Sequence, residues 1–388
     1  MTLRTLLAAA LVALAAAAGA AEPETQKRMN RALLQAVQTG HAQKVEAALQ
    51  AGADPDARIR EAGRTALMVA ADKGHAGLIP MLLDAGADVN GRSGDGWSAL
   101  MQAAYGRHAE AAERLLAAGA AVDLREDKYG NTALLIAARR GADRVADMLL
   151  AHDADPDVRD TADGNTPLIN AASAPYGLGP RIARHLLDAG ADPDLAADDG
   201  FTPLMAAART GNAELAELLL QHDAAANRQR DDGTSALMLA AHGRPGIVGR
   251  LLDAGADPTL RTAAGNTAVC LAIDAQAGQA LNRLLQSPDD ELLTARCRDG
   301  LPPIARAAKL GDEGLVERLL AAGADPNARG ADGSTALMWA ANRAALDAVR
   351  ALLQAGADPD AEADDGWTAR KAAEMRGAGD IAALLEAR

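Results

Sequence analysis

The chain has 388 residues, carries a formal net charge of -14 and is 49% hydrophobic, yet only 2% of its residues are aromatic. The negative charge argues against nucleic acid as a partner, because proteins that bind phosphate backbones present basic surfaces. The shortage of aromatic residues predicts a core of Ala, Leu, Val and Met, in which short helices approach one another closely.

The first 20 residues have the three regions of a secretory signal peptide. Arg4 supplies the positive charge, residues 5–18 are almost wholly apolar, and small residues follow. We expect cleavage after Ala20 or Ala21 and export to the periplasm of a Gram-negative bacterium, with secretion from the cell as the second choice. The alternative is an apolar helix of the mature fold. The polar residues 21–28 are expected to form a linker, and no later segment is apolar enough for membrane insertion.

From residue 29 onward the chain repeats one pattern every 32 to 36 residues. A turn glycine, a hydroxyl residue, an apolar stripe, a Leu-Leu pair and a Gly-Ala-Asp turn follow in fixed order. Regular spacing in this range indicates stacked units of two short helices each. The turn glycines are Gly63, Gly96, Gly130, Gly164, Gly200, Gly233, Gly265, Gly300, Gly333 and Gly366. The repeat domain is therefore assigned to 29–388, with units that start near 29, 61, 94, 128, 162, 198, 231, 263, 298, 331 and 364.

One unit shows the pattern most completely. It contains Asp199-Gly200-Phe201-Thr202-Pro203-Leu204, then Ala207-Ala208, Gly211-Asn212 and Leu218-Leu219. These residues resemble the ankyrin repeat, and the resemblance covers nearly the whole chain from Met29. It implies the all-α class, as an ankyrin-repeat solenoid of about eleven helix pairs joined by short β-hairpin loops. It also implies protein binding through the concave surface and the hairpin tips, and we expect a monomer.

The residue types at the helix ends predict the helix boundaries. A Ser or Thr lies two residues after nine of the ten turn glycines, where a helix needs an N-cap. Pro302 replaces it in the remaining unit. Glycine ends most second helices in the left-handed conformation, and Asp153 and Asp223 take that place in two units. The hydroxyl residues are Thr65, Ser98, Thr132, Thr166, Thr202, Ser235, Thr267, Thr335 and Thr368.

Two segments depart from the repeat. Residues 173–180 lengthen the turn between the two helices of one unit. Residues 273–298 lack the Gly-Ala-Asp turn, and the only two cysteines, Cys270 and Cys297, lie beside or within this segment. In an oxidising compartment these cysteines could form a disulfide. The alternative is two separate residues, with Cys270 buried at the position that Met occupies in other units.

No constellation of residues points to catalysis, a metal or a cofactor. His41, His75 and His108 occupy one repeat position in successive units. Neighbouring helices pack about 8–10 Å apart, whereas each ligand must lie about 2 Å from its metal ion. The carboxylates recur in phase with the repeat and are explained by turns. We therefore predict a protein that is not an enzyme; the alternative is an enzyme whose site lies in residues 273–298.

The residues that differ between units are the candidates for partner binding. Three residues that follow a turn glycine are aromatic, and basic residues end several first helices. The resemblance implies that the aromatic residues at the hairpin tips contact partners and that the basic residues, with the Asp residues of the hairpin tips, border the concave groove. The alternative is that the rings pack on the neighbouring hairpin and that the cations only complement helix C-termini. The predicted partner-binding residues are Trp97, Tyr105, Arg107, Arg139, Arg140, Tyr176, Phe201, Arg209 and Trp367.

These patterns predict a non-catalytic scaffold that binds an unidentified protein partner, without nucleic acid and without cofactors. Rigid stacked units would present a pre-formed surface, so binding would cost little ordering entropy. A more specific alternative is an immunity-type inhibitor, or an accessory factor that protects an exported oxidative-stress enzyme such as a catalase.

Overall fold

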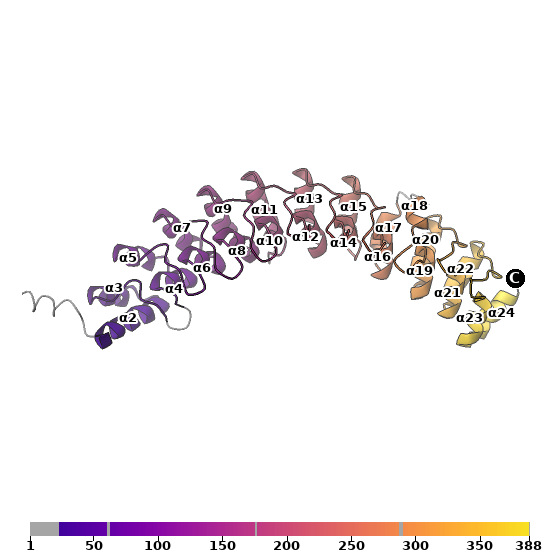
Figure 1. Cartoon of the computed structure of the whole chain (residues 1–388), viewed down its shortest axis with the longest axis horizontal. Helices are drawn as coiled ribbons and strands as arrows, with labels where there is room; N and C mark the ends of the chain where they lie inside the picture. Colours follow the sequence, from indigo (N-terminus) through magenta and orange to yellow (C-terminus); the bar gives the residue numbers. More distant parts are fainter. Residues whose placement is uncertain (1–22, 60–62, 175–176, 287–289, 388) are drawn as a thin grey trace, which may run out of the picture. The chain divides into compact units, whose positions relative to one another are not determined.

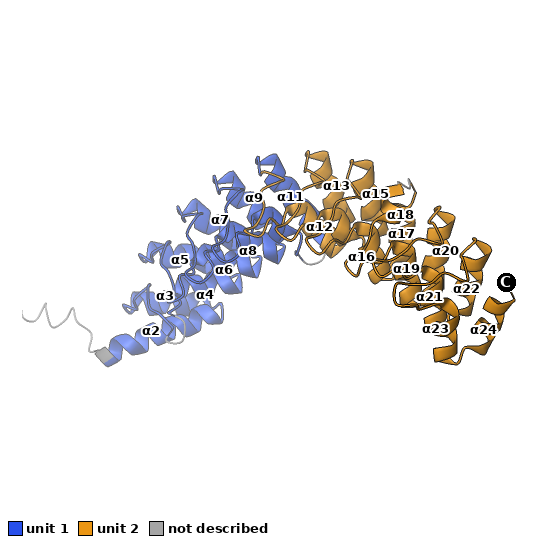
Figure 2. Cartoon of the chain, turned by 45° about the vertical axis from the view of Figure 1, so that its right-hand side comes forward, with its two compact units in different colours: residues 1–191 blue, residues 192–388 orange. Residues whose placement is uncertain are grey.

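The computed structural model describes residues 23–59, 63–174, 177–286 and 290–387. Within these residues the chain forms 23 helices, labelled α2 to α24, and no sheet (Figure 1). They make eleven helix pairs and one additional short helix, α18, which confirms the predicted all-α solenoid. The chain divides into two compact units, Met1–Ala191 and Asp192–Arg388 (Figure 2).

The first unit contains five helix pairs. First helices pack on first helices of the next pair, as α4 does on α6 and α6 on α8, and second helices do the same, as α7 does on α9 (Figure 1). The pairs are α2 (Pro23–Gln38) with α3 (Ala42–Gln50), α4 (Ala66–Lys73) with α5 (Leu78–Asp84), α6 (Ala99–Gly106) with α7 (Ala109–Ala117), α8 (Ala133–Arg140) with α9 (Asp143–Ala151), and α10 (Pro167–Ala171) with α11 (Gly179–Asp188).

The second unit contains six helix pairs and α18. Its first and second helices also pack in two separate rows, except that α18 contacts α19 beside the irregular segment. The elements are α12 (Pro203–Thr210), α13 (Ala213–Gln221), α14 (Ala236–Ala240), α15 (Pro245–Asp253), α16 (Ala268–Asp274), α17 (Gly278–Leu284), α18 (Asp290–Thr294), α19 (Pro303–Leu310), α20 (Glu313–Ala321), α21 (Ala336–Asn342), α22 (Leu346–Gln354), α23 (Ala369–Arg376) and α24 (Gly379–Glu386).

The core consists of small and aliphatic side chains, as the composition predicts. In α4, every residue from Ala66 to Ala71 is buried, and the facing helices contribute Ile79 and Leu82 from α5 and Leu100 from α6. Helices this short are marginally stable alone, so burial against neighbouring repeats must supply most of their stability.

The N-terminal linker prediction is wrong for the residues that the structure describes. Residues 23–28 form the first turns of α2. Their polar side chains have partners that suit a helix: Lys27 Nζ lies 2.9 Å from Glu24 Oε1, and Gln26 Nε2 donates to the carbonyl of Gly52 at 3.0 Å. The second bond ties this helix to the turn that follows α3. The predicted signal peptide, residues 1–20, lies outside the described residues.

The predicted caps are largely present. Eight of the nine hydroxyl residues accept a hydrogen bond from the backbone N–H three residues later, as Thr65 Oγ1 does from Met68 at 3.3 Å. The exception is Thr335, whose hydroxyl has no partner among the described residues. Asp153 and Asp223 have φ of 64° and 63°, in the left-handed region as predicted. Arg107 has φ of 62°, which the sequence did not indicate.

The loops between repeats are short hairpins closed by one or two backbone hydrogen bonds. Ser93 N donates to the carbonyl of Trp97 at 2.9 Å, for example, and Ala197 N donates to that of Phe201 at 2.9 Å. Successive hairpins are also joined, since Asp127 N donates to the carbonyl of Asp95 at 3.1 Å. The described residues contain three isolated β-bridges but no strand, so the expected β-hairpins exist only in this minimal form.

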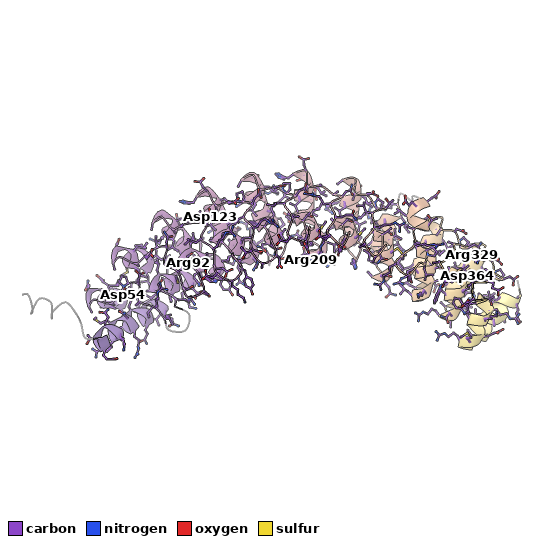
Figure 3. All side chains as sticks on the ribbon, in the orientation of Figure 1. Asp54, Arg92, Asp123, Arg209, Arg329 and Asp364 are labelled. Carbon is purple, nitrogen blue, oxygen red and sulfur yellow. A yellow bond between two sulfur atoms is a disulfide. The ribbon has the colours of Figure 1, made fainter. Side chains whose placement is uncertain are left out.

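Arginines on the hairpin arms bridge successive repeats inside each unit. Arg58 Nη1 donates to the carbonyl of Gly63 in its own turn at 2.9 Å and to the carbonyl of Arg92 in the next repeat at 2.6 Å. A guanidinium suits this place because its fork of five donors can satisfy carbonyls of two hairpins together. Equivalent bridges come from Arg92, Arg125, Gln229, Arg261 and Arg329 (Arg92 and Arg329 are labelled in Figure 3).

Cys270 and Cys297 form a disulfide, with Cα atoms 5.6 Å apart. Cys270 lies in α16 at the position that Met occupies in other repeats, and Cys297 lies in the following hairpin arm. Both residues are buried, at 0% and 5% exposure. The bond therefore fastens the hairpin before α19 to the first helix of the irregular repeat, whose outgoing turn departs from the common pattern.

Replacing Arg92 with Ala should lower the free energy of unfolding by about 1–2 kcal/mol, because three hydrogen bonds to a half-exposed guanidinium are lost. Urea unfolding of the full chain measures the change. The control is Arg114→Ala, which removes only an exposed ion pair with Glu110 and should cost less than about 0.5 kcal/mol. Equal losses in both variants would mean that the bridges between repeats add no stability.

The variant Cys270→Ala/Cys297→Ala should be less stable than the wild-type protein by about 3–4 kcal/mol, because the disulfide closes a loop with a sequence separation of 27 residues. Urea unfolding with and without reductant measures this difference. Reductant should shift the wild-type transition and leave that of the double variant unchanged. A wild-type transition that is indifferent to reductant after full unfolding and refolding would contradict the expectation.

Candidate functional site

A pocket of about 230 Å³ lies between two successive repeats of the first unit. Its walls come from the hairpins that precede α6 and α8 and from the C-terminal parts of those two helices. Of the nine predicted partner-binding residues, four line it together. The lining residues are Asp95, Trp97, Tyr105, Glu126, Lys128, Tyr129, Asn131, Ile136, Arg139 and Arg140.

The aromatic wall of the pocket is pre-assembled. The rings of Trp97 and Tyr105 meet edge to face, with centroids 5.8 Å apart and planes at 81°. Arg140 lies over the Tyr105 ring, with its guanidinium carbon 4.4 Å from the centroid, and its Nε donates to the Tyr105 carbonyl at 3.3 Å. Tyr105 nevertheless remains 45% exposed, so much of this ring is open to a partner.

Lys128 and Tyr129 line the pocket from the hairpin before α8. Lys128 Nζ lies 4.5 Å from the centroid of the Tyr129 ring, and Tyr129 is 44% exposed. Tyr105 and Tyr129 are two of the three exposed large hydrophobic residues in the described part of the chain. Exposed rings beside cations can bind apolar groups and pair with negative charge at the same place.

Glu126 holds this hairpin in shape. Its carboxylate accepts hydrogen bonds from the backbone N–H groups of Lys128, Tyr129 and Asn131 and from the Asn131 side-chain amide, at 2.8 to 3.1 Å. Burial opposes ionisation, but these four bonds outweigh it and hold the pKa of Glu126 below its ordinary value of 4.5. The carboxylate of Glu126 is therefore occupied by hydrogen bonds within its own hairpin.

Arg139 connects the pocket to the repeat that follows it in the sequence. Its guanidinium donates to the side-chain oxygens of Asn131 and Asn170 at 3.4 to 3.5 Å, and it lies 3.8 Å from Asp160 Oδ2. All of these contacts are long for charge-assisted bonds. Asn170 is 6% exposed, and its Nδ2 has no partner among the described residues.

The prediction that Phe201 points outward from its hairpin tip is wrong. Phe201 is only 7% exposed, and its ring packs against the guanidinium groups of Arg209 and Arg230, whose central carbons lie 4.5 and 5.6 Å from the ring centroid. Arg209 is exposed and is labelled in Figure 3. Leu301, at the equivalent position of another repeat, is 2% exposed. These residues serve packing, as in the alternative interpretation.

The remaining predicted residues do not gather at the pocket. Trp367 is half-buried and packs edge to face on Trp339, with centroids 5.1 Å apart. Arg107 is exposed at the end of α6 but lines a different hollow, together with His108. Tyr176 lies outside the described residues. The sequence analysis did not predict Lys128, Tyr129 or Ile136 as site residues. Tyr129 could have been found, because it directly precedes a turn glycine in a chain with only three tyrosines.

Among the described residues, no group of three His, Cys, Asp or Glu side chains could hold a metal ion, and no helix is long and apolar enough to cross a membrane. His108 Nε2 lies 2.9 Å from the carbonyl oxygen of Asp72 in the preceding repeat, so this ring takes part in packing between repeats.

Stacked helix pairs with hairpin loops, and a surface built from side chains that differ between repeats, define a class of repeat protein. The chain belongs to the ankyrin repeat family: the model "Ankyrin repeats (3 copies)" matches residues 7–93, 77–160, 168–262 and 304–387. The family resemblance seen in the sequence is thus confirmed.

Individual relatives match a smaller part of the chain. It is 35% identical over 165 residues to "Neurogenic locus notch homolog protein 1" of Cricetulus griseus, and 34% identical over 165 residues to the protein of that name of Homo sapiens. It is 35% identical over 167 residues to "Neurogenic locus notch homolog protein 2" of Homo sapiens. Each match covers 39% of this chain but only 6 to 7% of the relative.

Replacing Glu126 with Gln should destabilise the protein by about 1–2 kcal/mol at pH 7, because a charged acceptor of four hydrogen bonds is lost. A folded-state pKa below the unfolded one stabilises the protein above the unfolded pKa, and this stabilisation disappears as pH falls through the folded pKa. The difference between wild type and variant should therefore shrink on acidification below about pH 4. Urea unfolding across that range measures it. The exposed Glu113→Gln serves as control, and a pH-independent difference would contradict the assignment.

Proposed function

We propose that the protein is a non-catalytic scaffold that binds a protein partner with the surface around Trp97, Tyr105 and Arg140. The carrying observation is that these side chains, which lie at positions where the residue type varies among the repeats, form one open pocket. Clustered aromatic and arginine side chains are typical of the residues that dominate binding energy in protein interfaces.

The different locations of recurring and varying residues in each repeat support this function. The residues that recur, such as Leu100 and Met101, are buried and hold the stack together. The residues that vary lie after the turn glycine and at the end of the first helix, where Tyr105 and Arg140 are exposed. A rigid scaffold that presents variable side chains can bind a partner with little loss of conformational entropy.

We also propose that the protein works in the periplasm, after export by its N-terminal segment. The disulfide between Cys270 and Cys297 supports an oxidising compartment, since thiols stay reduced in the cytosol. The arrangement of charged, apolar and small residues in the first 20 positions supports the same location. Secretion from the cell is compatible with both observations.

Affinity capture on immobilised full-length protein tests the proposed function. A partner retained from periplasmic extract should bind the Trp97→Ala variant at least about 30-fold more weakly in calorimetric titration, because truncation of a central aromatic residue costs about 2 kcal/mol or more. The control is Met375→Ala, which truncates a 79% exposed apolar residue in α23 and should leave affinity unchanged. Circular dichroism checks that both variants are folded.

Two outcomes of the capture experiment would contradict the proposed function. One is that no protein is retained above the level of an unrelated control column. The other is that the retained partner binds wild type and Trp97→Ala with equal affinity, which would place recognition elsewhere on the chain. The identity of a specific partner would also decide between a general scaffold and an inhibitor or accessory factor of an exported enzyme.

A further inference from the structure

The volume of the pocket limits what can enter it. It measures about 230 Å³, whereas sites for small molecules and cofactors usually enclose about 300–1,000 Å³. Its apolar surface comes from the rings of Trp97, Tyr105 and Tyr129 and from the buried Ile136. A space of this size and lining fits one large apolar side chain of a partner protein.

The charges around the pocket favour acidic neighbours for that side chain. No described residue forms an ion pair with Arg140 or Lys128, although the chain as a whole has a net charge of -14. The two cations stand on different walls, since Arg140 lies at the end of α8 and Lys128 on the preceding hairpin. Two carboxylates on either side of an inserted residue could each meet one of them.

The acidic side chains of the pocket are already engaged within its own hairpins. Glu126 accepts four hydrogen bonds inside its loop. Asp95 accepts one from the Ser93 hydroxyl. Lys128 also interacts electrostatically with Glu126, but no carboxylate of the described residues forms an ion pair with Lys128 or Arg140, so both cations remain available to a partner.

We propose that this pocket binds an acidic segment of the protein partner, in which one aromatic or leucine side chain is flanked on both sides by Asp or Glu. The apolar side chain enters between Trp97, Tyr105 and Tyr129, and the flanking carboxylates pair with Arg140 and Lys128. This inference rests on the proposed function and names the partner chemistry for the same site.

Selection from a phage-displayed library of random linear peptides on the immobilised full chain tests the proposal. Enriched peptides should contain an aromatic or leucine residue between acidic residues. A synthetic copy of an enriched peptide should bind Tyr105→Ala and Arg140→Gln at least about tenfold more weakly than wild type in fluorescence anisotropy. Added salt should weaken wild-type binding, because exposed charges are screened.

The chain offers a matched control for the arginine variant. Arg343 is also exposed, and its Nε donates to the carbonyl of Lys309 at 2.6 Å, in the same way as Arg140 Nε donates to that of Tyr105. Arg343→Gln should therefore leave peptide affinity unchanged. In Arg140→Glu, a peptide whose acidic residues are replaced by Lys should bind better than the original peptide, which a purely structural role of Arg140 would not produce.

Several outcomes would overturn the proposal. In the selection, these are enrichment of basic or uncharged sequences, or no enrichment at all. In the binding assay, one is equal affinity of the peptide for wild type and Arg140→Gln. Another is that a single-stranded oligonucleotide binds more tightly than the peptide and that Arg140→Gln abolishes this binding. The proposed function can survive such a failure, because a partner captured from extract can depend on Trp97 without presenting an acidic segment. It fails if capture yields no specific partner, or if the captured partner binds wild type and Trp97→Ala with equal affinity.

Discussion

The hydrogen bonds that pass from one hairpin to the next set the register of the repeats within each unit. Burial of Ala and Leu side chains drives the helices together, but apolar contact is not directional and would tolerate sliding. The guanidinium of Arg58 or Arg261 requires two carbonyls, in its own turn and in the next repeat, at one relative position. These directional hydrogen bonds fix the position of each repeat relative to the next, so that the short helices stack regularly.

A regular stack makes the proposed recognition surface possible. Since the caps, the buried stripes and the bridging arginines are occupied with holding the repeats together, only a few positions are left to vary. In the first unit, two successive repeats place Trp97 with Tyr105 and Tyr129 with Arg140 at or near these positions. Fixed register brings residues from two repeats to the same pocket, which neither repeat could form alone.

The sequence predicted the scaffold better than the site, for a physical reason. Period and caps depend on residues within one repeat, so the eleven helix pairs and the left-handed Asp153 could be read directly. The environment of Phe201 depends on Arg230 from the following hairpin, and the helical start of the chain depends on the bond from Gln26 to Gly52. These particular contacts between neighbouring repeats do not recur with the repeat period, which is why exposure was misjudged at Phe201 and Tyr129 was overlooked.

The disulfide lies beside repeats in which the usual helix cap and the usual methionine contact are missing. The next first helix, α19, begins after Pro302, which has no hydroxyl to cap it. In regular repeats a methionine sulfur, such as that of Met68, accepts the N–H of the capping residue. Cys270 occupies that position and instead reaches the hairpin arm through Cys297. The covalent bond thus connects helix and hairpin in the second unit, while the pocket in the first unit is held by hydrogen bonds and packing.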